Sequence, residues 1–321
     1  MDEKLKQNIV HLAILLVLLL ALVATLIFTG ILGCNIVPGG CELYYTVLKG
    51  GAPQILIVHG DEGLGDYIKL EALFNEPDLL RARAKSMDIE KISYGNITEY
   101  DLIVVKQARK ICSDKLKIFM FYVNSGGRLV WTADAGTELC SGEVSGNTSQ
   151  TDEFLLESQR TEGKEAKIIG PWARKEGDDQ LSFDEFLGVN YKGNYCEFTE
   201  CVPDLEVGRI EPISSSHKLT YGLSPSIPFE GDFSVVEFNN APNSRLVAVL
   251  DYGTNLLGES YGQPWLESGK KYDFGKKIPF IVSSQVGERV AYYAAPLESF
   301  VQGKQQYKAL IEQMYYGMLY N

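Results

Sequence analysis

A long apolar segment near the N-terminus constrains this chain more than any other feature. From Ile9 to Gly33 the sequence is IVHLAILLVLLLALVATLIFTGILG, and no charged residue interrupts it. A bilayer core is crossed by about 20 apolar residues in a helix, so the segment is long enough to span it. A buried core helix of this length usually keeps a polar face. We therefore predict a tail at residues 1–8 and one transmembrane helix at residues 9–33.

A cleaved signal sequence is the main alternative to an uncleaved anchor. Signal sequences have apolar regions of only about 7 to 15 residues, so the length of this segment favours the uncleaved anchor. The tetrapeptide Ile31-Leu-Gly-Cys34 nevertheless resembles the site at which lipoproteins are cleaved and acylated on cysteine. Cleavage or acylation at Cys34 therefore stays open.

Basic residues indicate the orientation of the predicted helix. Lys4 and Lys6 precede it, and the first basic residue after it is Lys49. Positive residues flanking a membrane span stay on the cytoplasmic side, so we expect a cytoplasmic N-terminus in a single-pass cell-membrane protein. Residues 34–51 would then be a tether, and residues 52–321 an extracytoplasmic domain.

Two N-glycosylation sequons and six cysteines also suit an extracytoplasmic domain. The sequons begin at Asn96 and Asn147. An even number of cysteines suggests disulfides, and all of them lie beyond the apolar segment: Cys34, Cys41, Cys112, Cys140, Cys196 and Cys201. Sequence alone does not fix their pairing. Short separations favour Cys196 with Cys201 first, followed by Cys34 with Cys41 and Cys112 with Cys140.

Charge and residue content argue against several classes of ligand. The net charge is −12, and the charged residues before the apolar segment cancel, so the whole charge belongs to the part beyond it. An acidic surface repels phosphate, which argues against nucleic acid. Three histidines and no C-x-x-C pair make a zinc site unexpected. The Gly-rich turn at residues 60–65 lacks dinucleotide-binding spacing, so we expect no cofactor.

Alternating strands and helices follow the tether. Apolar runs of strand length and stretches of helical periodicity alternate, at residues 54–59, 66–74, 89–94, 101–105, 113–123 and 128–132. Such alternation implies parallel βαβ units. We predict an α/β fold with a flavodoxin-like, doubly wound, mostly parallel sheet.

The second half of the domain is less regular. Residues 135–212 are rich in Gly, Ser, Asp and Glu and hold three of the cysteines, so we predict a long disulfide-braced insertion. Four β-branched and aromatic segments after it predict strands, and an amphipathic helix closes the chain, at residues 233–238, 245–250, 278–283, 289–293 and 304–319.

Five short segments, in their order, resemble the class I glutamine amidotransferase-like superfamily. They are ILIVHGDEG, NITEYDLIVV, FYVNSGGRLVWTADAGT, SHKLTYGL and GERVAYYAAPLES, and they cover most of residues 52–320 outside the insertion. The ThuA-like and β-galactosidase trimerisation-like branches, which are not amidotransferases, are the most similar. The resemblance implies the fold described above.

The same resemblance argues against the family's reaction. Amidotransferases of this family carry a Cys nucleophile in a Gly-x-Cys-x-Gly turn, where this chain has Thr132-Ala-Asp134-Ala-Gly136. Their catalytic His lies in a His-Pro-x-Glu-like segment, where this chain has Ala294-Ala-Pro-Leu-Glu298. Without a nucleophile and a base, we expect a pseudoenzyme with no catalytic residue.

Polar residues at the carboxyl ends of the first strands are the candidate ligand site. Open α/β sheets bind ligands at that edge, and the candidates there are His59, Asp61, Glu62, Lys106 and Asp134. Such a group could bind a divalent cation or sugar hydroxyls. Acids in loops of an acidic protein are also commonly just solvated.

These observations favour a non-enzymatic, membrane-anchored binding or assembly domain at the cell envelope. Its expected partner is a protein or a carbohydrate, and a homo- or hetero-oligomer is compatible with the sequence. The alternative is an extracytoplasmic hydrolase of carbohydrate or amide bonds, with Asp134 and Glu62 as its carboxylate pair.

The predicted topology can be tested on intact cells. Added protease should degrade residues 34–321 and leave a small membrane-embedded stub, because only the N-terminal tail and helix would be shielded. Immunoblots against tags at each end would follow both parts, with cells opened by detergent as the control. Protection of the full-length chain would contradict the orientation.

Overall fold

The computed structural model describes residues 3–28, 45, 50–76, 79–145, 170–176, 179–201, 206–260, 263, 265–266, 268–300 and 305–320. Contacts divide the chain into two compact units, Met1–Ala52 with Tyr320–Asn321, and Pro53–Leu319. The predicted cysteines Cys34 and Cys41 and the sequon residue Asn147 lie outside the described residues.

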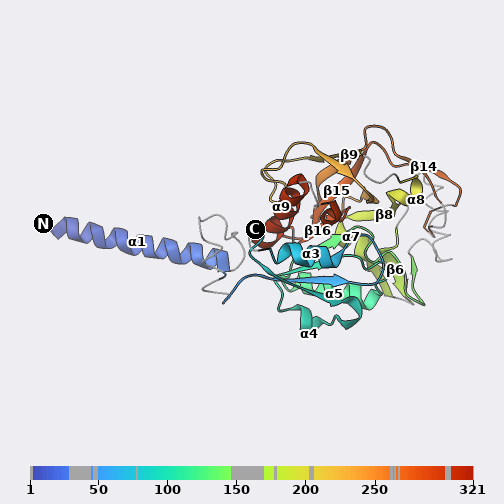
Figure 1. Ribbon diagram of the computed structural model, residues 1–321. Coiled ribbons are helices and arrows are strands. Elements are labelled where there is room, and N and C mark those ends of the chain that lie inside the picture. The colour runs from blue at the N-terminus through green and yellow to red at the C-terminus, as the bar shows by residue number, and fades with distance from the viewer. Residues whose placement is uncertain are drawn as a thin grey trace, which may run out of the picture. The chain divides into compact units, whose positions relative to one another are not determined.

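Helix α1 (Glu3–Phe28) contains the apolar segment (Figure 1). Its stretch Gln7–Thr25 has a mean hydropathy of 2.6, which makes it long and apolar enough to cross a membrane. Side chains such as Leu12 and Leu18 are exposed. Among the described residues this is the one helix with these properties. Residues 29–33 of the predicted span lie outside the described part.

A mixed nine-stranded sheet forms the centre of the second unit. Its strands, in spatial order, are β10 (Ile227–Glu230), β9 (Glu206–Pro212), β12 (Arg245–Asp251), β15 (Lys277–Ser284), β16 (Val290–Tyr293), β4 (Leu129–Thr132), β3 (Leu102–Val105), β1 (Gln54–His59) and β2 (Arg83–Asp88). Following the pairings across the sheet, only β15 and β9 run against the other strands. The prediction of a mostly parallel sheet is therefore confirmed. The strand predicted at residues 89–94 is wrong, because the strand is β2 at Arg83–Asp88 and Ile89–Lys91 form a single helical turn.

The parallel part of the sheet has flavodoxin-like order. Strands β2, β1, β3, β4 and β16 are adjacent and parallel, which is the 2-1-3-4-5 arrangement of that fold. Strands β3 and β4 are buried along their whole length, as parallel strands covered on both faces are. The antiparallel extension begins at β15 because the short turn at residues 285–289 permits a hairpin and no crossover.

Helices cover both faces of this sheet. Trp131 of β4 contacts Phe119 of α5 (Ser113–Asn124) and Phe183 of α7 (Phe183–Leu187). On the opposite face, Tyr315 of α9 (Gln305–Tyr320) contacts Tyr293 of β16 and Phe74 of α3 (Tyr67–Phe74). Trp131 is in register with Tyr292 of β16, so these two side chains lie on the same face of the sheet. Tyr293 is the next residue of that strand and therefore points to the opposite face.

The remaining elements are short. Single-turn helices are η3 (Ile89–Lys91), α4 (Tyr94–Ile97), α8 (Tyr195–Phe198) and η4 (Leu297–Phe300). One small sheet consists of β5 (Val144–Ser145), β6 (Ala173–Glu176) and β7 (Asp179–Ser182). Two further two-stranded sheets pair β8 (Val189–Asn194) with β11 (Ser234–Phe238), and β13 (Leu257–Glu259) with β14 (Lys271–Asp273).

The predicted insertion has different bounds in the structure. Residues 206–212 form β9 within the central sheet, so the insertion ends before them. The predicted strand at residues 233–238 exists as β11 but pairs with β8 outside the central sheet. The strand signal was right for β11, but β8 lies inside the predicted irregular insertion and was not predicted. A burial pattern also does not name the partner of a strand.

Two of the predicted disulfides are confirmed, and they brace the region as expected. Cys112 is bonded to Cys140, and Cys196 to Cys201. The sequon residue Asn96 is half-buried in α4, where its Nδ2 donates to Lys91 O over 2.8 Å and its Oδ1 accepts from Ser93 N over 2.9 Å. Its amide is therefore engaged in the folded chain.

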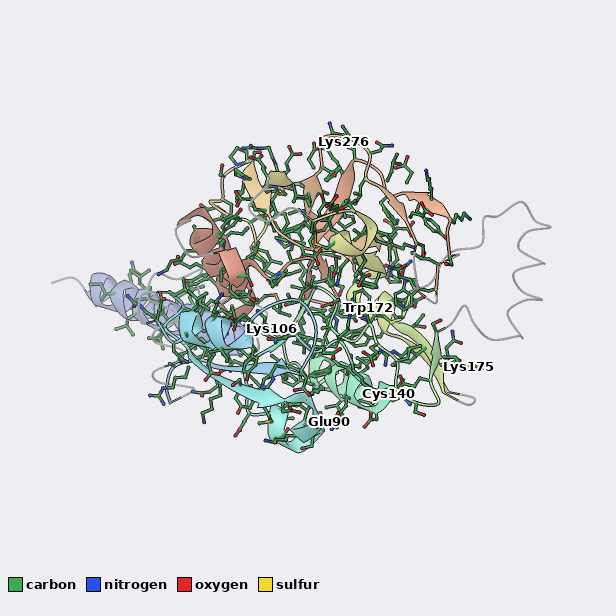
Figure 2. The ribbon with its side chains drawn as sticks, turned by 45° about the vertical axis from the view of Figure 1, so that its right-hand side comes forward. Glu90, Lys106, Cys140, Trp172, Lys175 and Lys276 are labelled. Atoms are coloured by element: carbon green, nitrogen blue, oxygen red, sulfur yellow. A yellow bond between two sulfur atoms is a disulfide. The ribbon has the colours of Figure 1, made fainter. Side chains whose placement is uncertain are left out.

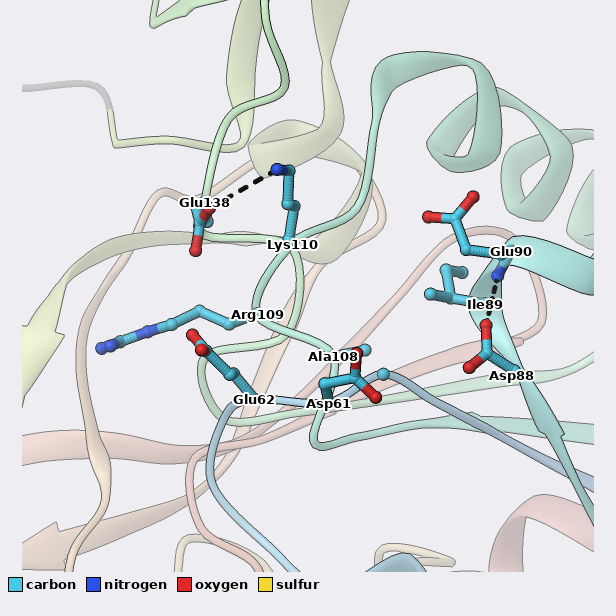
Figure 3. Close-up of a pocket in the computed structure, with 10 residues that line it drawn as sticks. Asp61, Glu62, Asp88, Ile89, Glu90, Ala108, Arg109, Lys110 and Glu138 are labelled. Atoms are coloured by element: carbon cyan, nitrogen blue, oxygen red, sulfur yellow. Dashed lines mark hydrogen bonds and ion pairs between the residues drawn. The ribbon is translucent and has the colours of Figure 1, made fainter.

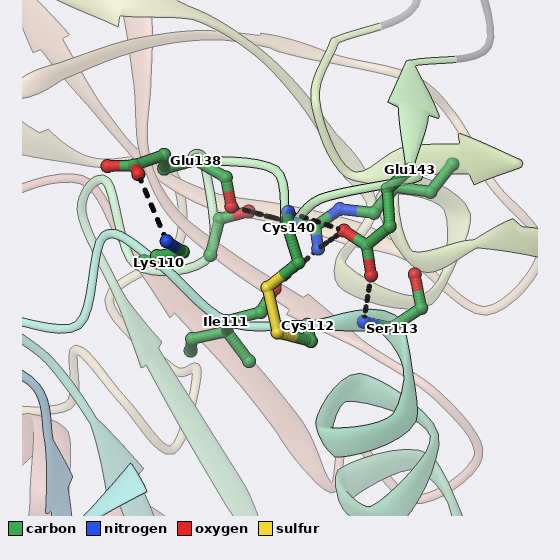
Figure 4. The surroundings of a disulfide bond; sticks show 9 residues. Lys110, Ile111, Cys112, Ser113, Glu138, Cys140 and Glu143 are labelled. Carbon is green, nitrogen blue, oxygen red and sulfur yellow. Dashed lines mark hydrogen bonds and ion pairs between the residues drawn. A yellow bond between two sulfur atoms is a disulfide. The ribbon is translucent and has the colours of Figure 1, made fainter. Parts of the chain in front are cut away.

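A buried guanidinium, that of Arg174, joins the insertion to the loops that follow β3 and β4. Figure 4 shows its partner Glu143 beside the Cys112–Cys140 disulfide. Arg174 pairs with Glu143 over 2.9 Å and donates to the carbonyls of Ile111, Gly136 and Pro171. Burial lowers the pKa of Arg174 to about 10, although Glu143 opposes this. Nearby Trp172 is also fully buried (Figure 2).

The partner carboxylate is held in its charged form. Burial raises the pKa of Glu143, but the backbone N–H groups of Cys140 and Ser113 and the charge of Arg174 outweigh burial, and the net pKa is lowered. A carboxyl with a lowered folded pKa stabilises the fold above its unfolded pKa. That contribution is lost as the pH falls through the folded pKa.

We predict that Arg174→Met destabilises the full-length chain by about 3–5 kcal/mol, because it leaves Glu143 buried without its cation. Urea unfolding in detergent would measure this. Glu143→Gln is the matched variant: it should lower stability at neutral pH and flatten the loss that the wild type shows on acidification. The quantity to compare is the free energy of unfolding of the wild type minus that of Glu143→Gln. If this difference does not change with pH, the lowered pKa of Glu143 is contradicted.

Candidate functional site

The loops that follow β1, β3 and β4 meet at the carboxyl edge of the parallel strands. Backbone hydrogen bonds join them: Gly60 N donates to Gln107 O over 2.9 Å, and Arg109 N donates to Glu62 O over 2.8 Å. Gly136 N continues the series by donating to Ala108 O over 2.8 Å. The three loops therefore form one connected layer over the end of the sheet.

A pocket of about 280 Å³ opens in this layer (Figure 3). Its lining comes from the ends of four parallel strands: Gly60, Asp61, Glu62, Asp88, Ile89, Glu90, Ala108, Arg109, Lys110 and Glu138. Five of these residues are acids and two are basic. Lys110 lies 3.9 Å from Glu138, and Asp88 Oδ1 accepts from Glu90 N over 2.8 Å. The pocket is therefore acidic, with exposed carboxylates at Asp61, Glu62 and Glu90.

The five predicted ligand residues do not converge. Asp61 and Glu62 line the pocket, whereas His59, Lys106 and Asp134 are absent from its lining. The His59 ring stacks on Tyr67 with centroids 3.6 Å apart, and its Nδ1 lies 3.3 Å from Gly60 O. The carboxyl-edge rule placed these residues at the correct edge but could not tell which side chains turn inward.

Asp134 has a structural position at the end of β4. It is only 1% exposed, and Oδ1 accepts from Leu64 N over 2.8 Å. Its Oδ2 accepts from Asn194 Nδ2 over 3.0 Å and lies 3.2 Å from Arg109 Nε. One carboxylate thus joins the turn after β1, the loop after β3 and the end of β8.

The strained residue of the turn after β4 is Ala133. Its φ of +52° lies in the left-handed region, where non-glycine residues are uncommon. Nucleophile elbows place the reactive residue at such a strained strand-to-helix turn. The alignment of motifs had given that position to Asp134, but the strain lies one residue earlier, where the side chain is a methyl group.

Lys106 and Glu298 form a buried ion pair beside the Gly-rich turn. Burial lowers the pKa of Lys106 well below its usual value, and the Asp66 carboxylate partly opposes this. Glu298 also accepts from Asp66 N over 3.1 Å. Gly65 has a φ of +114°, in the region that favours glycine, and a Cβ there would lie 2.6 Å from Lys106 Cε.

Several contributing residues were missed by sequence analysis. Arg109 lines the pocket and bridges Asp134 to Glu197 of α8. Asn194 holds the other side of Asp134. Arg109 follows a predicted strand closely, so the carboxyl-edge rule could have included it. No sequence signal places Asn194 or Glu197 there, because they come from the irregular region.

Comparisons with known proteins support the fold. No protein-family model matches the chain, and no curated protein matches it in sequence. A ThuA-like protein from Bacteroides uniformis is similar in structure, with 16% identity, a TM-score of 0.50, and coverage of 83% of this chain and 92% of that one. A β-galactosidase from Rahnella sp. R3 is also similar in structure, with 12% identity and a TM-score of 0.50. The match covers 84% of this chain and 32% of that enzyme.

These similarities are consistent with a class I glutamine amidotransferase-like fold. At such low identity they show the fold alone, so the chemistry must be argued from the site itself.

We predict that Lys106→Met destabilises the full-length chain by about 3–5 kcal/mol, because Glu298 would stay buried without a cation. The double variant Lys106→Met with Glu298→Gln should recover at least half of this loss, since glutamine can still accept from Asp66 N. A double-mutant cycle of unfolding free energies measures the coupling. Additive losses would contradict a structural pair.

Proposed function

We propose that this chain is a membrane-anchored, extracytoplasmic binding domain of the class I glutamine amidotransferase-like superfamily that does not perform the family's reaction. Support for the anchor comes from α1, whose stretch Gln7–Thr25 is long and apolar enough to cross a membrane. Support for the outward orientation comes from Lys4 and Lys6 before the helix.

The observation that carries the proposal is the use of the former catalytic region for structure. Ala133, with its methyl side chain, occupies the strained turn. Asp134 is held by Leu64 N, Asn194 and Arg109. A general acid or base needs a position from which it reaches the substrate, and a carboxylate enclosed by three donors has none.

The acidic pocket is the proposed binding site. Asp61 and Glu62 are exposed at its rim, and acids outnumber bases in its lining. Such a lining favours a ligand or partner segment that presents a cationic group, because approach of positive charge relieves the repulsion among the carboxylates. A cationic group on an envelope polymer or on a basic protein segment has this chemistry.

A polyamine probe tests the site directly. We expect the full-length chain in detergent to bind spermine, and the double variant Asp61→Asn with Glu62→Gln to bind it about two- to thirtyfold more weakly, since each lost charge pair removes about 0.2–1 kcal/mol. Calorimetry at low and physiological salt would measure both. Glu312→Gln, which removes an exposed carboxylate on α9, is the matched control and should bind like the wild type.

Two outcomes would refute the proposal. One is equal spermine affinity for the wild type and the pocket variant. The other is hydrolysis of generic amide or glycoside substrates that Asp134→Asn abolishes in a chain that stays folded, because this would restore the hydrolase alternative.

A further inference from the structure

The Cys196–Cys201 disulfide lies beside a carboxyl group that the proposed binding function does not use. Both sulfur atoms and one carboxylate oxygen of Asp232 lie within 4.8 Å of one another. Cys196 belongs to α8, whereas Cys201 follows that helix and is exposed to solvent. Cys196 is not buried either, so a reagent in solution can reach the disulfide while the carboxyl group lies near both sulfurs.

Asp232 is held firmly in this position. Its Oδ1 accepts from Cys196 N over 3.0 Å and from Phe233 N over 2.9 Å. The first of these bonds attaches the carboxyl group to the backbone of the disulfide itself. The geometry is therefore fixed by the fold and does not depend on a long flexible side chain.

The surroundings of Asp232 bring its pKa closer to neutral pH. Burial raises its pKa to about 6, the N–H groups of Cys196 and Phe233 oppose this, and the carboxylates of Asp134 and Glu197 raise the pKa further. A group with a pKa close to the working pH both supplies and accepts protons efficiently. Asp232 therefore has the protonation behaviour that a thiol reaction requires.

We propose that Cys196, Cys201 and Asp232 form a thiol–disulfide exchange site that reacts with a dithiol, such as a pair of cysteines on a partner protein. A thiolate of the dithiol attacks the exposed Cys201 sulfur, and the bond between Cys201 and Cys196 breaks. Cys196 leaves with the electron pair and takes the proton of Asp232. The second thiol of the partner then attacks the mixed disulfide and releases Cys201.

The exchange is balanced in atoms and electrons. The partner dithiol loses two electrons and two protons and becomes a disulfide, while Cys196 and Cys201 gain them as thiols. Asp232 regains its proton from the partner's second thiol, and Cys201 takes from water the proton that the partner's first thiol released when it became a thiolate. In the reverse direction Asp232 accepts the proton of Cys196 and so promotes the attacking thiolate.

The other disulfide of the described region offers a contrast within the same chain. Cys112–Cys140 also lies beside a carboxyl group, Glu143, but the pKa of Glu143 is lowered. Glu143 is therefore ionised at neutral pH and paired with Arg174. It has no proton to give, so Cys112–Cys140 is a structural bridge.

A metal site at the same three residues is the competing hypothesis. Two thiolates and one carboxylate would supply three ligands of a tetrahedral zinc site. The sulfurs are bonded to each other, however, and a disulfide offers no thiolate to a metal. The exchange hypothesis uses the bonded state that the structure shows.

The test follows both disulfides in the full-length chain in detergent. Dithiothreitol would be added over a range of pH, and differential alkylation with mass spectrometry would quantify each pair. We expect Cys196–Cys201 to be reduced at least tenfold faster than Cys112–Cys140. Its rate per reductant thiolate should fall as the pH rises through about 6, because Asp232 loses the proton that it donates.

Asp232→Asn is the decisive variant, since asparagine keeps an oxygen that can accept from Cys196 N and Phe233 N. It should slow reduction of Cys196–Cys201 by roughly tenfold or more and remove the inflection near pH 6. Glu312→Gln should change neither. The wild-type pH profile is informative even if the variant does not fold. Equal rates for the two disulfides, a wild-type profile without the inflection, or an unchanged profile in folded Asp232→Asn would overturn the proposal.

Discussion

The carboxylate of Asp134 is the interaction on which the candidate site depends. It accepts from Leu64 N and Asn194 and pairs with Arg109, so it joins three segments that are distant in sequence. Hydrogen bonds to a buried charge are stronger than those between neutral groups. With this carboxylate in place, the loops after β1 and β3 are fixed against each other, and the pocket between them has a defined shape.

Buried ion pairs hold loops in place near the carboxyl edge of the sheet. Lys106 with Glu298 joins the end of β3 to the segment after β16. Arg174 and Glu143 pair within the insertion, and they bond to Ile111 O and Ser113 N at the start of α5. Such pairs add little net stability compared with apolar packing, but losing one partner is costly. We infer that they specify how the loops are placed over the sheet.

Two carboxyl groups beside two disulfides show how environment decides chemistry. Glu143 receives backbone N–H groups and a guanidinium, and its pKa is lowered. Asp232 also receives two N–H groups, but burial and the neighbouring acids Asp134 and Glu197 outweigh them, and its pKa is raised. The same functional group is therefore held as an anion in one place, whereas in the other its pKa is raised to about 6.

The sequence by itself determined the features that depend on local patterns. The uninterrupted apolar run predicted α1, the alternation of apolar strands and helices predicted β1, β3 and β4 of the parallel half, and close spacing predicted Cys196–Cys201 and Cys112–Cys140. Only the tertiary structure decided that β11 pairs with β8, that β9 joins the central sheet, and that Asp134 turns away from the pocket. The physical reason is that periodicity records which face of an element is buried, whereas the partner of a strand and the direction of a polar side chain depend on residues far away in the chain.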